Sequence, residues 1–104
     1  MATEIRSAVL LTFSPDARLV AAAGGVARYF ADSAGMEADA VAKLQSETLQ
    51  ACNATIAQLP DKGAQLLVEV TRFADRIEVA IAKQGDAPIT RIITYLAHSS
   101  SAST

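Results

Sequence analysis

Residues 66–82 read LLVEVTRFADRIEVAIA, and apolar side chains recur at every second position of two runs within this stretch. The recurring apolar positions are Leu66, Val68, Val70, Ile77, Val79 and Ile81. A period of two is typical of strands that bury one face. Phe73-Ala74-Asp75 separates the two runs and supplies a short turn. The stretch therefore predicts an antiparallel β-hairpin.

An earlier β-favouring run covers Ala8–Phe13 and stops at Ser14-Pro15-Asp16. Ser14 is a good helix N-cap, Pro15 suits the first helical position, and Asp16 complements the helix dipole. We therefore predict a strand followed by a helix from Pro15 to Ala34. The buried stripe expected for this helix, at spacings of three and four residues, is Leu19, Ala23, Val26, Ala27 and Phe30.

A second helix is predicted from Glu37 to Leu59, with Gly35 as the C′ residue that ends the first helix. Residues 60–63, PDKG, end the second helix. Its expected core stripe is Val41, Leu44, Thr48, Ala51, Cys52, Thr55, Ile56 and Leu59. Gly24-Gly25 lies inside the first helix, where no GxxxxGK phosphate-loop pattern follows it, so we expect close helix packing or a local bend.

The residues after Pro88 fit two structures. Ile89, Ile92, Ile93 and Leu96 have the spacing of a short amphipathic helix, while ITRIITY at residues 89–95 is also rich in β-branched side chains. With the helix, the order is β-α-α-β-β-α. This predicts an α+β fold, a two-layer sandwich in which helices pack on one face of an antiparallel or mixed sheet.

The predicted organisation is one domain over residues 1–98 and a mobile Ser-rich tail over residues 99–104. The sheet face away from the helices is expected to be open and partly apolar, suited to a partner protein or a second copy of the chain. The residues expected on that face are Leu10, Leu67, Thr71, Glu78, Ala80 and Ala82.

Composition excludes several classes of function. The 104-residue chain has a net charge of −2 and no basic run, which argues against a nucleic-acid surface. Cys52 is the only cysteine, no segment approaches the roughly 20 apolar residues of a membrane span, and the N-terminus lacks signal-peptide order, so a cytoplasmic location is expected. His98 is the only histidine, so we expect neither a metal site nor a Ser/His/Asp arrangement.

Three short motifs follow one another along residues 8–88, and their order is informative. They are the turn Ala34–Asp39 between the helices, Cys52-Asn53-Ala54 on the second helix, and KQGDAP at residues 83–88 after the hairpin. In this order the chain resembles the small ATP-binding domains of the GHKL superfamily, especially the anti-sigma-factor serine kinases. The resemblance implies a Bergerat-type fold, with Asn53 at the position of a Mg²⁺ ligand and Gly85 at the first glycine of the nucleotide-binding turn.

The same resemblance shows where the chemistry of the family is missing. Leu49 stands where the family has its catalytic acid, and a Leu cannot accept a proton. Lys83 stands at the adenine-binding Asp, and Ala87 at the second glycine. The sequence also ends before an ATP lid or a second phosphate loop. We therefore predict no catalytic residues, no cofactor and no enzymatic activity.

The function predicted from these losses is a non-catalytic regulatory or adaptor protein that acts through protein–protein contacts. The resemblance implies a sigma factor or an anti-sigma antagonist as the partner, and a homodimer is an alternative. A second hypothesis is a weak ATP-binding serine kinase with a rebuilt site formed by Glu47, Asn53, Gly85 and Lys83. A third is a small, dimerising α+β domain whose resemblance to the family is accidental.

Overall fold

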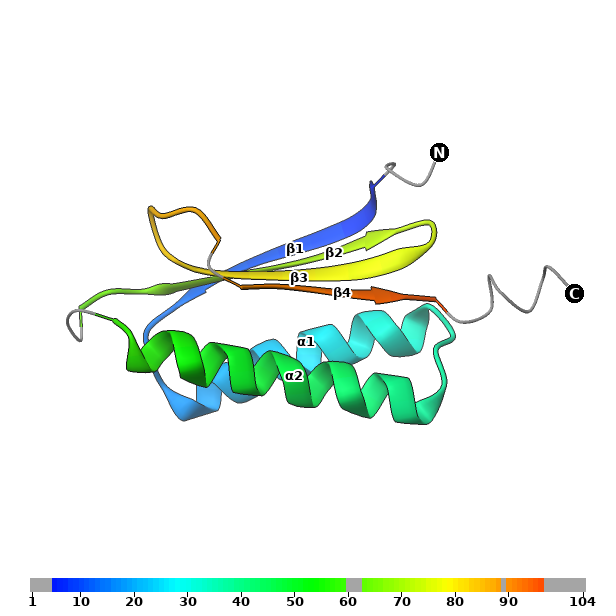
Figure 1. Cartoon of the computed structure of the whole chain (residues 1–104), viewed down its shortest axis with the longest axis horizontal. Helices are drawn as coiled ribbons and strands as arrows, with labels where there is room; N and C mark the ends of the chain where they lie inside the picture. Colours follow the sequence, from blue (N-terminus) through cyan, green and yellow to red (C-terminus); the bar gives the residue numbers. More distant parts are fainter. Residues whose placement is uncertain (1–4, 60–62, 89, 97–104) are drawn as a thin grey trace, which may run out of the picture.

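A computed structural model describes residues 5–59, 63–88 and 90–96 of the chain. Two helices and four strands follow one another in the order β-α-α-β-β-β (Figure 1). They are β1 (Ile5–Phe13), α1 (Ala17–Ser33), α2 (Ala38–Ala57), β2 (Leu66–Phe73), β3 (Arg76–Lys83) and β4 (Thr90–Tyr95). The predicted tail over residues 99–104 lies outside the described residues.

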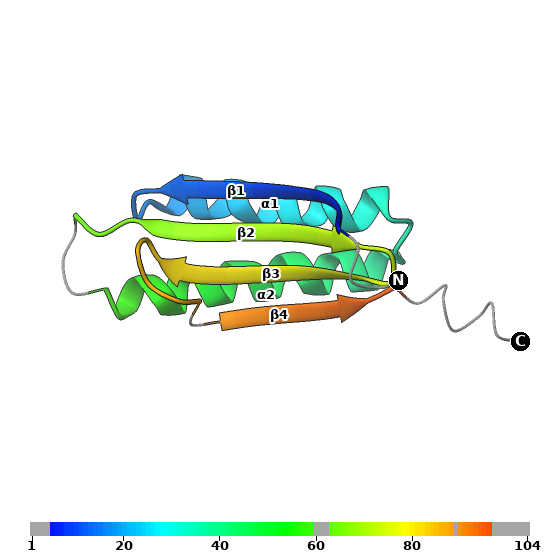
Figure 2. The ribbon, with the colours of Figure 1, turned by 90° about the horizontal axis from the view of Figure 1, so that it is seen from above.

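The four strands form one sheet in the order β1-β2-β3-β4, and every neighbouring pair is antiparallel. Both helices lie on the same face of this sheet, which gives two layers (Figures 1 and 2). The predicted two-layer α+β sandwich is therefore confirmed, and the sheet is antiparallel rather than mixed.

The last element is a strand, so the predicted C-terminal helix is wrong and the alternative of a strand is right. β4 pairs with β3 from Ile81↔Thr90 to Ile77↔Thr94. Without β4, one side of the β3 backbone would lack strand partners, whereas β-branched side chains at residues 90, 92, 93 and 94 suit a sheet edge. Ile89, which belonged to the predicted helical stripe, lies outside the described residues.

The hairpin at the centre of the sheet agrees with the sequence pattern. β2 and β3 pair from Leu66↔Lys83 to Arg72↔Ile77. All six side chains of the alternating apolar set are fully buried, and they belong to the core cluster beneath the helices. The period of two therefore identified both the strands and their buried face.

The first helix begins two residues later than predicted, because Asp16 rather than Ser14 is its N-cap. The Asp16 side chain accepts a hydrogen bond from the Arg18 backbone N–H at 2.8 Å, and its hydrogen bonds with Arg18 lower the pKa of this carboxyl. The buried stripe also differs, since Leu19 is 40% exposed while Val20 and Ala31 are buried. Leu19 lies about 140° around the helix from Gly24, the residue that faces α2.

The turn between the helices is the predicted one. Gly35 has φ +80°, and the Gly35 and Met36 N–H groups donate to the carbonyls of Asp32 and Ala31 at 3.0 and 3.2 Å. These are the two hydrogen bonds of a Schellman motif, which favours glycine at C′. α2 then runs from Ala38 to Ala57, within the predicted range.

The two glycines of the Gly24-Gly25 pair have different surroundings. A Cβ on Gly24 would lie 2.8 Å from Leu49 Cδ2, whereas nothing lies within 4 Å of a Cβ on Gly25. The predicted close helix packing therefore holds at Gly24 alone.

The sheet face opposite the helices is less open than predicted. Thr71 and Ala80 are buried, and Ala82 is only 1% exposed, while Leu10 is 59% exposed. Ala80 pairs with Glu69 on one side and Arg91 on the other, so longer side chains flank it. At the Ala82 end, the loop between β3 and β4 curves over this face (Figure 1). Exposed apolar side chains therefore remain toward the two edge strands.

Candidate functional site

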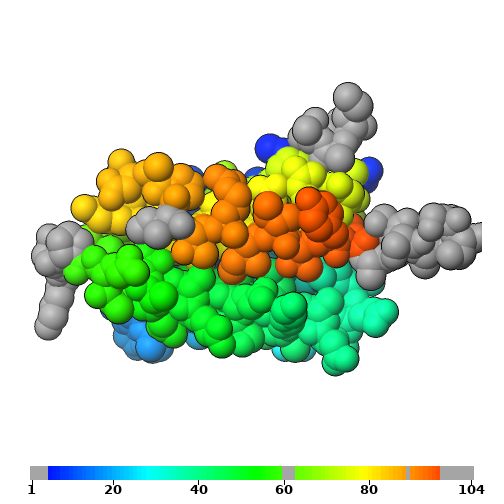
Figure 3. All heavy atoms as spheres, viewed as in Figure 1, coloured from blue at the N-terminus to red at the C-terminus, as the bar shows by residue number. Residues whose placement is uncertain are grey.

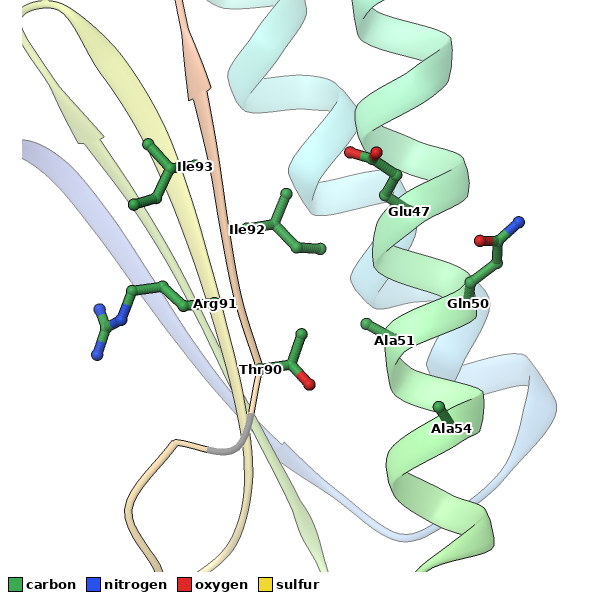
Figure 4. A pocket seen from close by; sticks show the side chains of 8 residues that line it. All are labelled: Glu47, Gln50, Ala51, Ala54, Thr90, Arg91, Ile92 and Ile93. Carbon is green, nitrogen blue, oxygen red and sulfur yellow. The ribbon is translucent and has the colours of Figure 1, made fainter.

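A groove runs between α2 and the edge strand β4, and we call it the α2–β4 groove (Figures 3 and 4). Its larger part has a volume of about 580 Å³. The residues that line this part are Glu47, Gln50, Ala51 and Ala54 from α2 and Thr90, Arg91, Ile92 and Ile93 from β4. A second hollow of about 330 Å³ shares Glu47 and Ile93 with the first and extends to Lys43 and Tyr95. Together, the two hollows follow the whole length of β4.

The groove exists because the helix side that faces β4 carries small residues. Ala51 and Ala54 line it where the Thr90 and Ile92 side chains point toward α2 (Figure 4). Ala40 has the same role at the other end. β4 is also the last strand of the sheet, so one side of its backbone has no neighbouring strand in the described part of the chain. An edge strand of this kind presents N–H and C=O groups that can pair with another strand.

Apolar and charged side chains surround this open edge. Ile93 is 45% exposed and Tyr95 is 64% exposed, so the outward-facing side of β4 is partly apolar. Glu47 and Lys43 lie one helical turn apart on the groove wall, and neither takes part in an ion pair between described residues. The groove thus offers a carboxylate and an ammonium group that are free to meet a ligand.

Several charges on the opposite sheet face are, by contrast, paired with one another. Glu78 accepts from Arg76 Nε at 2.7 Å and from Arg91 at 3.4 Å, and Arg76 also contacts Asp75 at 2.8 Å. The guanidinium of Arg76 lies 4.0 Å from the centre of the Phe73 ring. These contacts stabilise the end of the hairpin, and the Arg91 side chain, although Arg91 lies at the edge of the groove, points away from α2 (Figure 4).

The two residues predicted for a nucleotide site do not line the groove. Asn53 is exposed on α2, and Gly85 belongs to the loop on the opposite sheet face (Figure 1). Gly85 has φ +93°, and Asp86 N–H donates to the Lys83 carbonyl at 2.9 Å across this turn. Lys83 and Asp86 also form an ion pair at 4.0 Å. The geometry of this loop therefore explains its glycine as a turn residue.

Of the residues considered for a rebuilt site, only Glu47 lies in the groove. Leu49, which the resemblance aligned with the family acid, is partly buried and packs over Gly24 between the helices. In the larger hollow, the lining residues that sequence reasoning did not single out are Gln50, Thr90 and Arg91. The spacing of Glu47, Ala51 and Ala54 by four and three residues marks one helix side, but only the assignment of β4 as a strand shows what faces it.

The other chemically reactive side chains of the described residues form no second candidate site. Burial raises the pKa of the Cys52 thiol from 9.0 to about 11, so the thiol stays protonated at neutral pH. Among residues 5–59, 63–88 and 90–96, no three His, Cys, Asp or Glu side chains gather in a way that would hold a metal ion. None of the described helices is both long and apolar enough to span a membrane.

Comparison with models of known protein families and with curated proteins gives no match to this chain.

Proposed function

We propose that this protein is a non-catalytic regulatory or adaptor domain, and that it binds an extended segment of a partner protein in the α2–β4 groove. The observation that carries the proposal is an unpaired sheet edge beside a groove that follows its whole length. A partner strand added to β4 would gain backbone hydrogen bonds, and every second side chain would enter the groove. Ala51 and Ala54 leave room for those side chains, and Glu47 favours a basic one.

The resemblance to anti-sigma-factor kinases suggests a sigma factor or an anti-sigma antagonist as the partner, acting in the cytoplasm. Two features support a binding role over a catalytic one. By the resemblance, Leu49 stands at the position of the family acid, and the described residues that line the larger hollow include one carboxylate, Glu47, with no second carboxylate, His or Cys beside it. General acid–base catalysis needs such groups within reach of a substrate.

Site-specific photocrosslinking in cells that produce this protein naturally tests the proposal. A photoreactive residue replaces Ile93 on the open edge strand, whose side chain points away from α2 (Figure 4) and would lie beside a strand added to β4, and in a control it replaces Arg18, whose side chain is 91% exposed at the start of α1. The expected result is a discrete cross-linked protein from position 93 and none from position 18. A product of twice the chain mass would identify the partner as a second copy. Equal labelling from both positions, or no product from either, would contradict the proposal.

A weak nucleotide-binding function is a second candidate, because Glu47 points from α2 into the larger hollow (Figure 4). Thermal unfolding with and without millimolar Mg²⁺-ATP tests it. A ligand at about 100 times its dissociation constant stabilises a protein by about 2.7 kcal/mol. A rise in midpoint that disappears in Glu47→Gln would support this candidate. A rise that survives Glu47→Gln, or no rise at all, would reject it.

A further inference from the structure

A second pocket lies at the other edge of the sheet and contains an arginine nitrogen without a hydrogen-bond partner. Arg72 on β2 has a buried Nε that makes no hydrogen bond. The pocket around it has a volume of about 290 Å³ and is lined by Ser7, Tyr29, Phe30, Ser33 and Arg72, which we call the Arg72 pocket. β1 and β4 are the two opposite edges of the sheet, so this pocket is separate from the α2–β4 groove.

The backbone of β1 is irregular at this place. Ile5 pairs with Phe73 and Ser7 pairs with Arg72, so Arg6 is an extra residue in the ladder. A bulge of this kind changes the direction of nearby side chains and occurs often beside functional sites. Here it puts Ser7 directly opposite Arg72, and residues paired in this way share one face of the sheet.

The pocket also has hydrogen-bonding capacity that the protein does not use. The hydroxyl groups of Ser7, Tyr29 and Ser33 make no hydrogen bond in the part of the chain that the structure describes. Together with Arg72 they place four polar side chains around one space. The rings of Tyr29 and Phe30 meet edge-to-face with their centres 6.4 Å apart, and Phe30 is buried. The pocket therefore has a polar side and an aromatic side.

No partner among the described residues accounts for the position of Arg72. None of the ion pairs between described residues includes it. The nearby C-terminus of α1 attracts a cation, but its carbonyls at Phe30, Ala31 and Asp32 accept hydrogen bonds from Ala34, Gly35 and Met36, and Arg72 makes no hydrogen bond to them. A buried donor without an acceptor is unfavourable, and a ligand oxygen would relieve that cost.

We propose that the Arg72 pocket binds a small organic oxyanion, a carboxylate or a phosphate monoester attached to a small apolar body. The planar guanidinium donates to the anionic oxygens, as it does in bidentate arginine–carboxylate and arginine–phosphate pairs. Ser7 and Ser33 donate further hydrogen bonds from their hydroxyl groups. The apolar body packs against the rings of Tyr29 and Phe30.

Titration of the isotope-labelled full chain by amide NMR tests this proposal with inorganic phosphate, phenyl phosphate and benzoate as separate probes. We expect saturable shifts that are largest at Ser7, Phe30, Ser33 and Arg72. Tighter binding of phenyl phosphate would assign a phosphate monoester, and tighter binding of benzoate would assign a carboxylate. Either result supports the proposal that the Arg72 pocket binds an organic oxyanion.

Variants connect the shifts to the proposed contacts. Arg72→Gln should weaken binding by about tenfold or more, as expected for loss of a charge-assisted hydrogen bond. Arg72→Lys should bind at an intermediate level, because it keeps the charge without the planar fork. Ser7→Ala tests the same pocket if Arg72→Gln fails to fold. Arg18→Gln, an exposed change at the other end of α1, should bind like the original protein.

Two results would overturn the proposal. One is the absence of saturable shifts for all three probes at 10 mM, roughly the weakest affinity that separates a site from non-specific contact. The other is binding that survives both Arg72→Gln and Ser7→Ala. Because these residues are distinct from those that line the α2–β4 groove, failure here leaves the crosslinking test at Ile93 unaffected.

Discussion

Small residues stand at two contacts of α2, Gly24 of α1 at one and Ala51 and Ala54 of α2 itself at the other, but with opposite outcomes. On the side toward α1, Gly24 accepts the Leu49 side chain, and the two helices pack closely. On the side toward β4, Ala51 and Ala54 face a groove of about 580 Å³. Small residues therefore close a helix interface only where a larger side chain from the other element enters the space they leave. Where none does, small residues leave an open groove.

The largest expected effect comes from removing the side chain that closes the α1–α2 interface. Leu49→Ala should lower the free energy of unfolding by about 2 kcal/mol, because it leaves a cavity over Gly24. Gln50→Ala is the matched control on the groove side of the same helix, and it should change the free energy by less than about 0.5 kcal/mol. Urea unfolding of both variants measures the difference. Equal losses would mean that the two sides of α2 are not energetically distinct.

The buried thiol between these two sides should make stability depend on alkaline pH. Burial raises the pKa of Cys52 from 9.0 to about 11, so the folded protein holds the proton more tightly than the unfolded chain. The stabilisation that depends on the protonated Cys52 thiol is fully present below pH 9 and is lost as the pH rises toward 11. Relative to Cys52→Ala, the protein should lose about 1 kcal/mol by pH 10.

Unfolding in urea at pH 8 and pH 10 measures this loss, with Cys52→Ala as the reference at each pH. Other groups titrate in both proteins, so only the difference reports on Cys52. The same pH dependence in both proteins would show that the thiol is not desolvated by the fold.

Alanine substitutions in the Gly24-Gly25 pair distinguish the effect of helix propensity from the effect of packing. Gly25→Ala should raise the free energy of unfolding by about 0.5–1 kcal/mol, since nothing lies within 4 Å of the new Cβ. Gly24→Ala should lack this gain, because its Cβ would come within 2.8 Å of Leu49 Cδ2. In a Leu49→Ala background the gain should return, and a double-mutant cycle measures this coupling. Equal gains in the single variants would rule out a tight contact.

The smallest effect on stability is expected where the groove is filled. Ala54→Leu should change the free energy of unfolding by less than about 0.5 kcal/mol, because residue 54 is exposed. It should nevertheless abolish the cross-link from position 93. Ala57→Leu, an exposed change on the same helix outside the groove lining, should leave that cross-link intact. A cross-link that persists in Ala54→Leu would place the partner elsewhere.

The site could be predicted from the sequence only in part. Glu47 was proposed as part of a rebuilt nucleotide site, and it lines the groove. Asn53 and Gly85 were selected because of a resemblance along the chain, and a linear order does not fix which sides of a helix and a sheet meet. Arg72 gave no signal, since an arginine in a strand pattern has the same appearance whether it reaches solvent or a pocket.

Local preferences of the chain determined the central hairpin, the two helices and the turn at Gly35, because periodicity, capping and a positive φ depend on residues close in sequence. Residues 90–95 were ambiguous by the same measures, and the need of β3 for a hydrogen-bonding neighbour made them a strand. That pairing also decides that Ala51 and Ala54 face an open edge, and the irregular pairing of β1 with β2 puts Ser7 opposite Arg72. Contacts between segments distant in sequence set these positions, so only the tertiary structure shows them.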